Sequence, residues 1–259
     1  MPVSAAEKQD MPERILIGLD DTDTPGGRGT GFQAMQLSEM IGLNGLGEVR
    51  AISRHQLLPG AALAPTSDNS SACIELHSGD IDRLTSFCIQ FIRNESAQDA
   101  HPGICISAWD AVSTPLIEWG RQAKTHILTI EDALHLARHH GILVDGRSAD
   151  SAGIIGAMAA VGLRRSGFDG RFLWLERLRD LTGIYSAEDL VALVRADAIR
   201  SANGEPLHPE ALVEVGEWFR PVNIHHQITI IVEPHPDATA AQWRTASRET
   251  TMLFSDLSL

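Results

Sequence analysis

The chain has 259 residues, 43% of them hydrophobic and 21% charged, which is the balance of a globular protein with a substantial core. Its net charge of −13 and aromatic content of only 5% argue against binding an extended nucleic acid, which needs clustered positive charge and rings for base stacking. No apolar run reaches the roughly 18 residues that span a membrane. Residues 1–13 are polar and acidic, unlike a signal peptide, so we expect a disordered tail on a cytoplasmic protein.

The segment 14–30, RILIGLDDTDTPGGRGT, predicts a strand, a turn-rich loop and the start of a helix for which Thr30 is the N-cap candidate. The strand leads into three carboxylates, Asp20, Asp21 and Asp23. These carboxylates repel one another unless a divalent cation or a basic partner neutralises them, and a helix start offers N–H groups to an anion. The segment therefore indicates a site for magnesium and phosphate groups, although the residues alone also allow a solvated acidic turn.

Common motifs do not account for this loop. A Walker loop requires Lys followed by Ser or Thr after the glycines, and Arg28 to Thr30 do not supply that pair. An EF-hand counted from Asp21 has Phe32 where the calcium-binding glutamate is required.

Hydrophobic periodicity and turn residues predict further elements along the chain. We expect helices over 31–43, 80–94, 113–123, 129–140, 153–162, 187–196 and 238–252, strands over 48–53, 71–77, 103–109, 172–178 and 228–232, and either a strand or a helix over 211–219. This order predicts an α/β domain over 14–146 and a second domain over 147–259. The small residues of the 153–162 helix, GIIGAMAAVG, favour close packing against another backbone over a binding site.

The stretch GLDDTDTPGGRGTGF resembles the opening signature of the tRNA-isoleucine 2-agmatinylcytidine synthetase family, where G-I-D-D-T-D-S is followed by glycine and C-T-T. GIIGAMAAVG is similar to the family's G-R-G-L-I-G-A-L-A-A-I-G. The resemblance implies an ATP-dependent, kinase-like α/β domain followed by a ferredoxin-like α+β domain. We expect the chain to lack the family's oligonucleotide-binding barrel and zinc ribbon, and therefore not to bind tRNA by itself.

The resemblance also implies roles for single residues. Magnesium and the ATP phosphates would be held by Asp20, Asp21 and Asp23, and Thr30 would accept or contact a phosphate. The implied cofactor contacts are Thr22, Gly26, Gly27, Arg28, Gly29 and Asn69. A lysine and an arginine that precede the family's G-N-A-A are missing here, where residues 65–67 read Pro-Thr-Ser.

These observations lead to two hypotheses. The first is magnesium- and ATP-dependent phosphoryl transfer, coupled to ligation of a small cationic amine such as agmatine. The second is a nucleotide- or metabolite-binding protein without catalysis, or one subunit of a split synthetase. The missing basic pair favours the second hypothesis, because phosphoryl transfer depends on positive charge beside the phosphates. The retained D-D-T-D and Thr30 favour the first.

Overall fold

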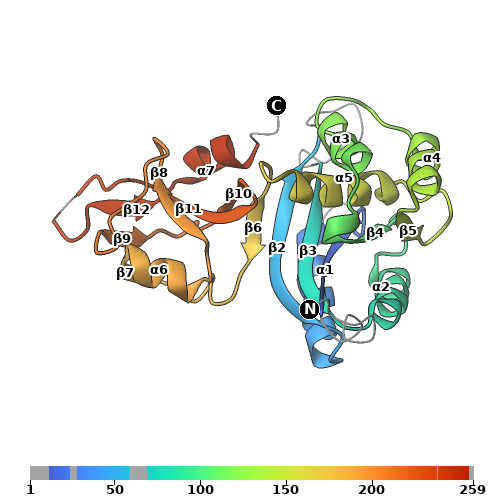
Figure 1. Ribbon diagram of the computed structural model, residues 1–259, viewed down its shortest axis with the longest axis horizontal. Coiled ribbons are helices and arrows are strands. Elements are labelled where there is room, and N and C mark those ends of the chain that lie inside the picture. The colour runs from blue at the N-terminus through green and yellow to red at the C-terminus, as the bar shows by residue number, and fades with distance from the viewer. Residues whose placement is uncertain (1–11, 24–27, 59–68, 238, 257–259) are drawn as a thin grey trace, which may run out of the picture. The chain divides into compact units, whose positions relative to one another are not determined.

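The computed structural model describes residues 12–23, 28–58, 69–237 and 239–256. The chain forms two compact units, residues 1–165 and 166–259, and each combines strands with helices (Figure 1). The mixed α/β class expected from the sequence is confirmed. None of the helices in the described ranges is long and apolar enough to cross a membrane.

The first unit is built on an antiparallel sheet with the strand order β5-β4-β1-β3-β2. β1 (Glu13–Asp20) lies in the middle, between β3 (Ser70–Ser78) and β4 (Gly103–Ala108). β2 (Glu48–Gln56) pairs with β3, and β5 (Leu143–Gly146) pairs with β4. β5 was not predicted, because its four residues are only partly buried and carry no alternating pattern.

Helices cover both faces of this sheet, which explains why β1 is buried on both sides and reads as a continuous apolar run (Figure 1). Leu16, Cys73 and Cys105 belong to one apolar cluster with residues of the helices on the first face. Those helices are α3 (Thr114–Gln122), α4 (Ile130–His140) and α5 (Gly153–Ser166). The opposite face carries α1 (Thr30–Leu43) and α2 (Ile81–Glu95).

The α5 helix packs so closely on the sheet that only glycine fits at several contacts. A Cβ on Gly18 of β1 would lie 2.0 Å from the Ala157 carbonyl oxygen. A Cβ on Gly103 of β4 would lie 2.0 Å from the backbone of Gly153, and one on Gly162 would lie 2.1 Å from a carbonyl oxygen of α3. The prediction that GIIGAMAAVG is a packing helix is therefore confirmed.

This packing also explains where the chain divides. The sequence placed the boundary at 146/147, in a small, polar, turn-rich segment, whereas the compact units divide between Arg165 and Ser166. The difference arises because α5 is sequestered on the first sheet and so belongs almost wholly to the first unit.

A buried carboxylate, that of Glu75 on β3, joins three parts of the first unit. Its Oε2 accepts from the Arg164 guanidinium of α5 at 2.6 Å, and both side chains are 1% exposed. Its Oε1 lies 2.7 Å from an Arg14 nitrogen of β1 and 3.6 Å from Arg50 Nε of β2. Burial alone would raise the pKa of Glu75, but the charges of Arg164, Arg14 and Arg50 outweigh it and lower the pKa.

The second unit contains a sheet with the strand order β6-β10-β11-β12-β9-β7, and β8 pairs with β11. The pairs β8–β11 and β12–β9 are parallel, and the other pairs are antiparallel. The strands are β6 (Arg171–Trp174), β7 (Gly183–Ser186), β8 (Ala198–Ser201), β9 (Leu212–Val215), β10 (Val222–Ile224), β11 (Gln227–Pro234) and β12 (Trp243–Thr245). The helices are α6 (Ala187–Leu193) and α7 (Arg248–Ser255).

Sequence patterns were least informative in this unit. The helix predicted over 238–252 is wrong: residues 243–245 form β12, paired with β11 and β9. The helix α7 begins only after Ser247, whose hydroxyl accepts from Thr250 N. Strand pairing overrides the helix propensity of the alanine-rich stretch. The ambiguous segment 211–219 contains β9, and the strand expected over 172–178 ends at Trp174.

We predict that Glu75→Gln destabilises the protein by about 3–5 kcal/mol, because it leaves the buried Arg164 guanidinium without an opposite charge. Glu118→Gln is the control, since Glu118 pairs with Arg121 at the surface and such pairs contribute about 1 kcal/mol or less. Urea unfolding monitored by circular dichroism measures both variants. Equal midpoints for the two would contradict the role assigned to Glu75.

Glu75→Gln should also change how the free energy of unfolding depends on pH in the acidic range. A carboxyl whose pKa is depressed by folding stabilises the folded state above its ordinary value of 4.5, and that contribution is lost as the pH falls through the lower folded pKa. The free energy of unfolding should therefore fall less steeply below about pH 4.5 in Glu75→Gln than in the wild type.

We also predict that Gly18→Ala costs at least about 1–3 kcal/mol, because its Cβ would overlap the backbone of α5. Gly42→Ala is a matched control within α1, where the added Cβ meets nothing within 4 Å and should stabilise by about 0.5–1 kcal/mol. Thermal unfolding should move in opposite directions for the two substitutions. A neutral Gly18→Ala would mean that α5 can lift away from β1.

Candidate functional site

The carboxylate of Asp20 lies at the end of β1, directly against α5. Its Oδ1 accepts from Asp21 N at 2.8 Å. A Cβ on Gly156 would lie 1.8 Å from Asp20 Oδ2, so glycine at this position of α5 makes room for the carboxylate. Gly153 N, at the first residue of α5, donates to the His101 carbonyl oxygen at 2.9 Å. The first turn of α5 thus borders Asp20, and a helix N-terminus favours negative charge.

Two adjacent carboxyl groups with raised pKa values meet here. Burial raises the pKa of Asp20 to about 7; the hydrogen bond from Asp21 N opposes this and the Asp21 charge adds to it. Burial also raises the pKa of Asp21, against the charge and the backbone N–H of His101. Within the described residues no guanidinium or ammonium group counters the desolvation of Asp20. A bound cation would relieve both carboxylates.

The residues that follow add a strained backbone and an unpaired hydroxyl. Asp21 has a φ of 49°, which is uncommon for a residue other than glycine. Thr22 is 1% exposed, and its Oγ1 has no hydrogen-bond partner in the described parts of the chain. Its carbonyl oxygen accepts from Ala97 N at 3.1 Å, which ties the loop to the end of α2. A buried hydroxyl without a partner, in the residue that follows the two carboxylates, fits a site that takes up a polar ligand.

Asp23 points to the start of α1 instead of joining the other two carboxylates. Its carboxylate accepts from Gly29 N. Gly29, with a φ of 82°, is the N-cap residue of α1, so the prediction that Thr30 caps this helix is wrong. Thr30 is therefore the first residue of α1 and is half-buried. Its hydroxyl makes no hydrogen bond with any described residue. The Arg28 guanidinium lies 4.6 Å from the centre of the Phe32 ring.

Of the remaining residues predicted for the site, only Asn69 lies within the described ranges. Gly26 and Gly27 lie outside the described residues, as do residues 65–67. Asn69, just before β3, donates through Nδ2 to the Leu58 carbonyl oxygen at 3.3 Å, and its own carbonyl accepts from Leu57 N at 2.9 Å. These bonds link the two ends of the 59–68 segment.

The described residues contain no group of three or more His, Cys, Asp or Glu side chains placed to hold a metal ion. The structure brings Asp20 and Asp21 together with Thr22, while Asp23 and Thr30 mark the start of α1. Sequence reasoning missed His101 and Gly156. His101 lies in a polar loop far along the chain, and Gly156 reads as a packing residue, so neither carries a local signal.

Comparison with known proteins gives one curated match. No family model matches the chain. The chain is 26% identical over 152 residues to the tRNA 2-agmatinylcytidine synthetase TiaS of Methanocorpusculum labreanum, a match that covers 57% of this chain and 34% of that protein.

Solved structures agree with this match. The complex of TiaS with its isoleucine tRNA and ATP has a TM-score of 0.52 and 26% identity over 58% of this chain and 36% of that chain. A tRNA fluorescent labeling enzyme has the same TM-score of 0.52 and 26% identity over 57% of this chain and 36% of its own. The chain thus spans about a third of the length of the relatives it matches. In sequence and in fold, it is similar to TiaS over more than half of its length.

Proposed function

We propose that the chain binds ATP with magnesium at the Asp20–Asp21 pair and transfers a phosphoryl group, as a TiaS-like protein. The observation that carries the proposal is the pair of desolvated carboxylates at the end of β1: Asp20 lies against the N-terminal turn of α5 with no cationic partner among the described residues, and Asp21 has only His101. The first unit would then be a kinase-like domain and the second a ferredoxin-like domain, and the protein would act in the cytoplasm.

The residues present fit a nucleotide with a divalent cation. Asp20 and Asp21 supply the oxygen ligands that magnesium prefers, and the next residue, Thr22, has a buried hydroxyl without a partner among the described residues. The N–H groups of Thr30 and Gly31 at the start of α1 have no acceptor among the described residues and suit a phosphate. Bound ATP would supply the phosphoryl group, and magnesium would neutralise its charge.

Within this arrangement Asp23 and Thr30 have separate tasks. Asp23 fixes the start of α1 through Gly29 N, and so orients the Thr30 N–H and hydroxyl. The Thr30 hydroxyl, which no described residue engages, would receive or contact the phosphoryl group. A small cationic amine such as agmatine would be the second substrate, and the net charge of −13 favours a cation.

The alternative is nucleotide binding without turnover, either as a sensor or as one subunit of a split synthetase. One observation favours it: Asp23 is turned to Gly29 N, so two carboxylates gather where three were predicted. Two ligands hold a metal–nucleotide complex less rigidly than three, and phosphoryl transfer depends on rigid positioning.

The first test is binding. Asp20→Asn combined with Asp21→Asn should lower the affinity for ATP with magnesium by about a hundredfold or more, since each substitution removes a charged contact of roughly 1.5–3 kcal/mol. Isothermal titration calorimetry measures the affinity, with and without magnesium. Glu39→Gln combined with Glu95→Gln, two exposed acids on α1 and α2, removes the same charge elsewhere. An unchanged affinity in the aspartate variant would end the proposal.

The second test separates transfer from binding. Thr30→Val keeps the shape and branching of the side chain but removes the hydroxyl, whereas Thr30→Ser keeps a hydroxyl that can attack. Incubation with ATP and magnesium, followed by mass spectrometry, should show phosphorylation or ATP consumption in the wild type and Thr30→Ser but not in Thr30→Val. Equal activity in all three proteins would remove Thr30 from the reaction. Tight nucleotide binding with no turnover in any of them would favour the alternative.

A further inference from the structure

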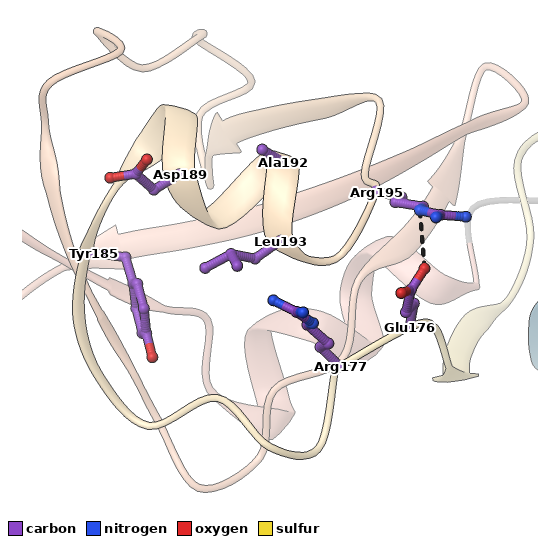
Figure 2. A pocket seen from close by; sticks show the side chains of 7 residues that line it. All are labelled: Glu176, Arg177, Tyr185, Asp189, Ala192, Leu193 and Arg195. Carbon is purple, nitrogen blue, oxygen red and sulfur yellow. Dashed lines mark ion pairs between the residues drawn. The ribbon is translucent and has the colours of Figure 1, made fainter.

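A cavity of about 350 Å³ lies in the second unit, between α6, β7 and the segment that follows β6 (Figure 2). Neither the acidic loop nor the proposed phosphoryl transfer uses it. Its walls combine charged side chains with an aromatic ring and the apolar side chain of Leu193. Pockets that bind small molecules begin at about 300 Å³, so this cavity suits a small ligand.

Two carboxylates and two arginines line the cavity, and one of the arginines, Arg177, takes part in no ion pair with a described residue. Glu176 Oε2 pairs with Arg195 Nε at 2.9 Å, which cancels two of the charges (Figure 2). Asp189 accepts from the Ser186 hydroxyl at 2.7 Å as part of the N-terminal cap of α6. Arg177 has no ion pair or side-chain hydrogen bond with any described residue. A guanidinium with free donors is suited to a phosphate or carboxylate, which it can bind through two parallel bonds.

Backbone strain is concentrated at the same place. Arg177 has a φ of 59° and Arg195 a φ of 50°, a left-handed conformation that costs stability in residues other than glycine. Only five such residues occur in the described ranges, and two of them line this one cavity. Strain that persists at two neighbouring arginines points to a role for the side chains that it positions.

The aromatic wall is Tyr185, the one tyrosine in the sequence. It is half-buried, and its hydroxyl has no hydrogen-bond partner in the described residues. Figure 2 shows Tyr185 and Arg177 extending from opposite sides toward the space beside Leu193, whereas Asp189 points away from it. An aromatic ring and an aliphatic side chain that line the same cavity suit a planar group, such as a nucleobase.

We propose that this cavity binds a nucleoside monophosphate, with the phosphate on Arg177 and the base against Tyr185. One guanidinium without an ion pair among the described residues suits one phosphate group, whereas a triphosphate would bring several negative charges close to Asp189 and Glu176. The proposal does not rest on the Asp20–Asp21 site, since it uses no residue of the first unit.

The test titrates the full chain, in EDTA, with AMP, GMP, CMP and UMP by isothermal titration calorimetry. At least one nucleotide should bind about tenfold or more tightly than inorganic phosphate or its own nucleoside, because both the phosphate and the base contribute. Arg177→Asn should weaken that binding about tenfold or more through the loss of a charged contact. Tyr185→Leu, which removes the ring and keeps the apolar bulk, should weaken it about tenfold.

Three variants show whether a loss of binding comes from the cavity itself or from a loss of folding or charge elsewhere. Asparagine tolerates the left-handed conformation, so Arg177→Asn should melt at or above the wild-type temperature while binding is lost. Arg179→Asn removes the same charge from the same segment outside the cavity, and should bind normally. Asp20→Asn combined with Asp21→Asn should also bind normally, which separates this cavity from the acidic loop.

Three results would overturn the proposal. The first is that none of the four nucleotides binds at millimolar concentration. The second is that Arg177→Asn binds a nucleotide as tightly as Arg179→Asn does. The third is loss of binding in the Asp20→Asn/Asp21→Asn protein with binding retained in Arg177→Asn, which would assign the nucleotide to the acidic loop.

Discussion

The contact of α5 with β1 and β4 is the constraint on which the first unit depends. Backbone meets backbone at Gly18 and Gly103, with no side chain between the helix and the sheet. Such a contact leaves no room for a side chain, because an added methyl group would overlap a carbonyl group. The same contact places Gly156 against Asp20, so the packing of the core and the geometry of the acidic loop are a single feature.

Charged groups fix α5 at both ends. Its first turn borders the carboxylate of Asp20, and its last turn supplies Arg164 to the buried Glu75. The negative carboxylate lies at the N-terminal end of α5, where the helix dipole is positive. The positive arginine lies near the C-terminal end, where the helix dipole is negative. A helix held in this way cannot slide along the sheet without breaking a buried ion pair, so the position of Asp20 is coupled to the salt bridge at Glu75.

Sequence reasoning predicted the first unit better than the second, for a physical reason. The elements of the first unit are long, and signals such as Thr129 and Gly141 at the two ends of α4 are local. The strands of the second unit are mostly three or four residues long and exist because of pairing partners distant in the chain, as β12 does between β11 and β9. For the candidate site, the sequence predicted three neighbouring carboxylates, but it gave no signal that the Asp23 carboxylate would accept from Gly29 N, six residues further along the chain.

Two buried carboxylates of the first unit differ in their electrostatic surroundings. Glu75 has Arg14, Arg50 and Arg164 around it, so its buried charge is more than balanced and its pKa is lowered. Asp20 has a raised pKa, because burial acts on it without an opposing cation among the described residues. Near neutral pH its ionised form therefore costs the folded state stability, which a bound cation would restore. The first unit thus contains one buried carboxylate whose pKa is lowered by three arginines and another whose pKa is raised by burial.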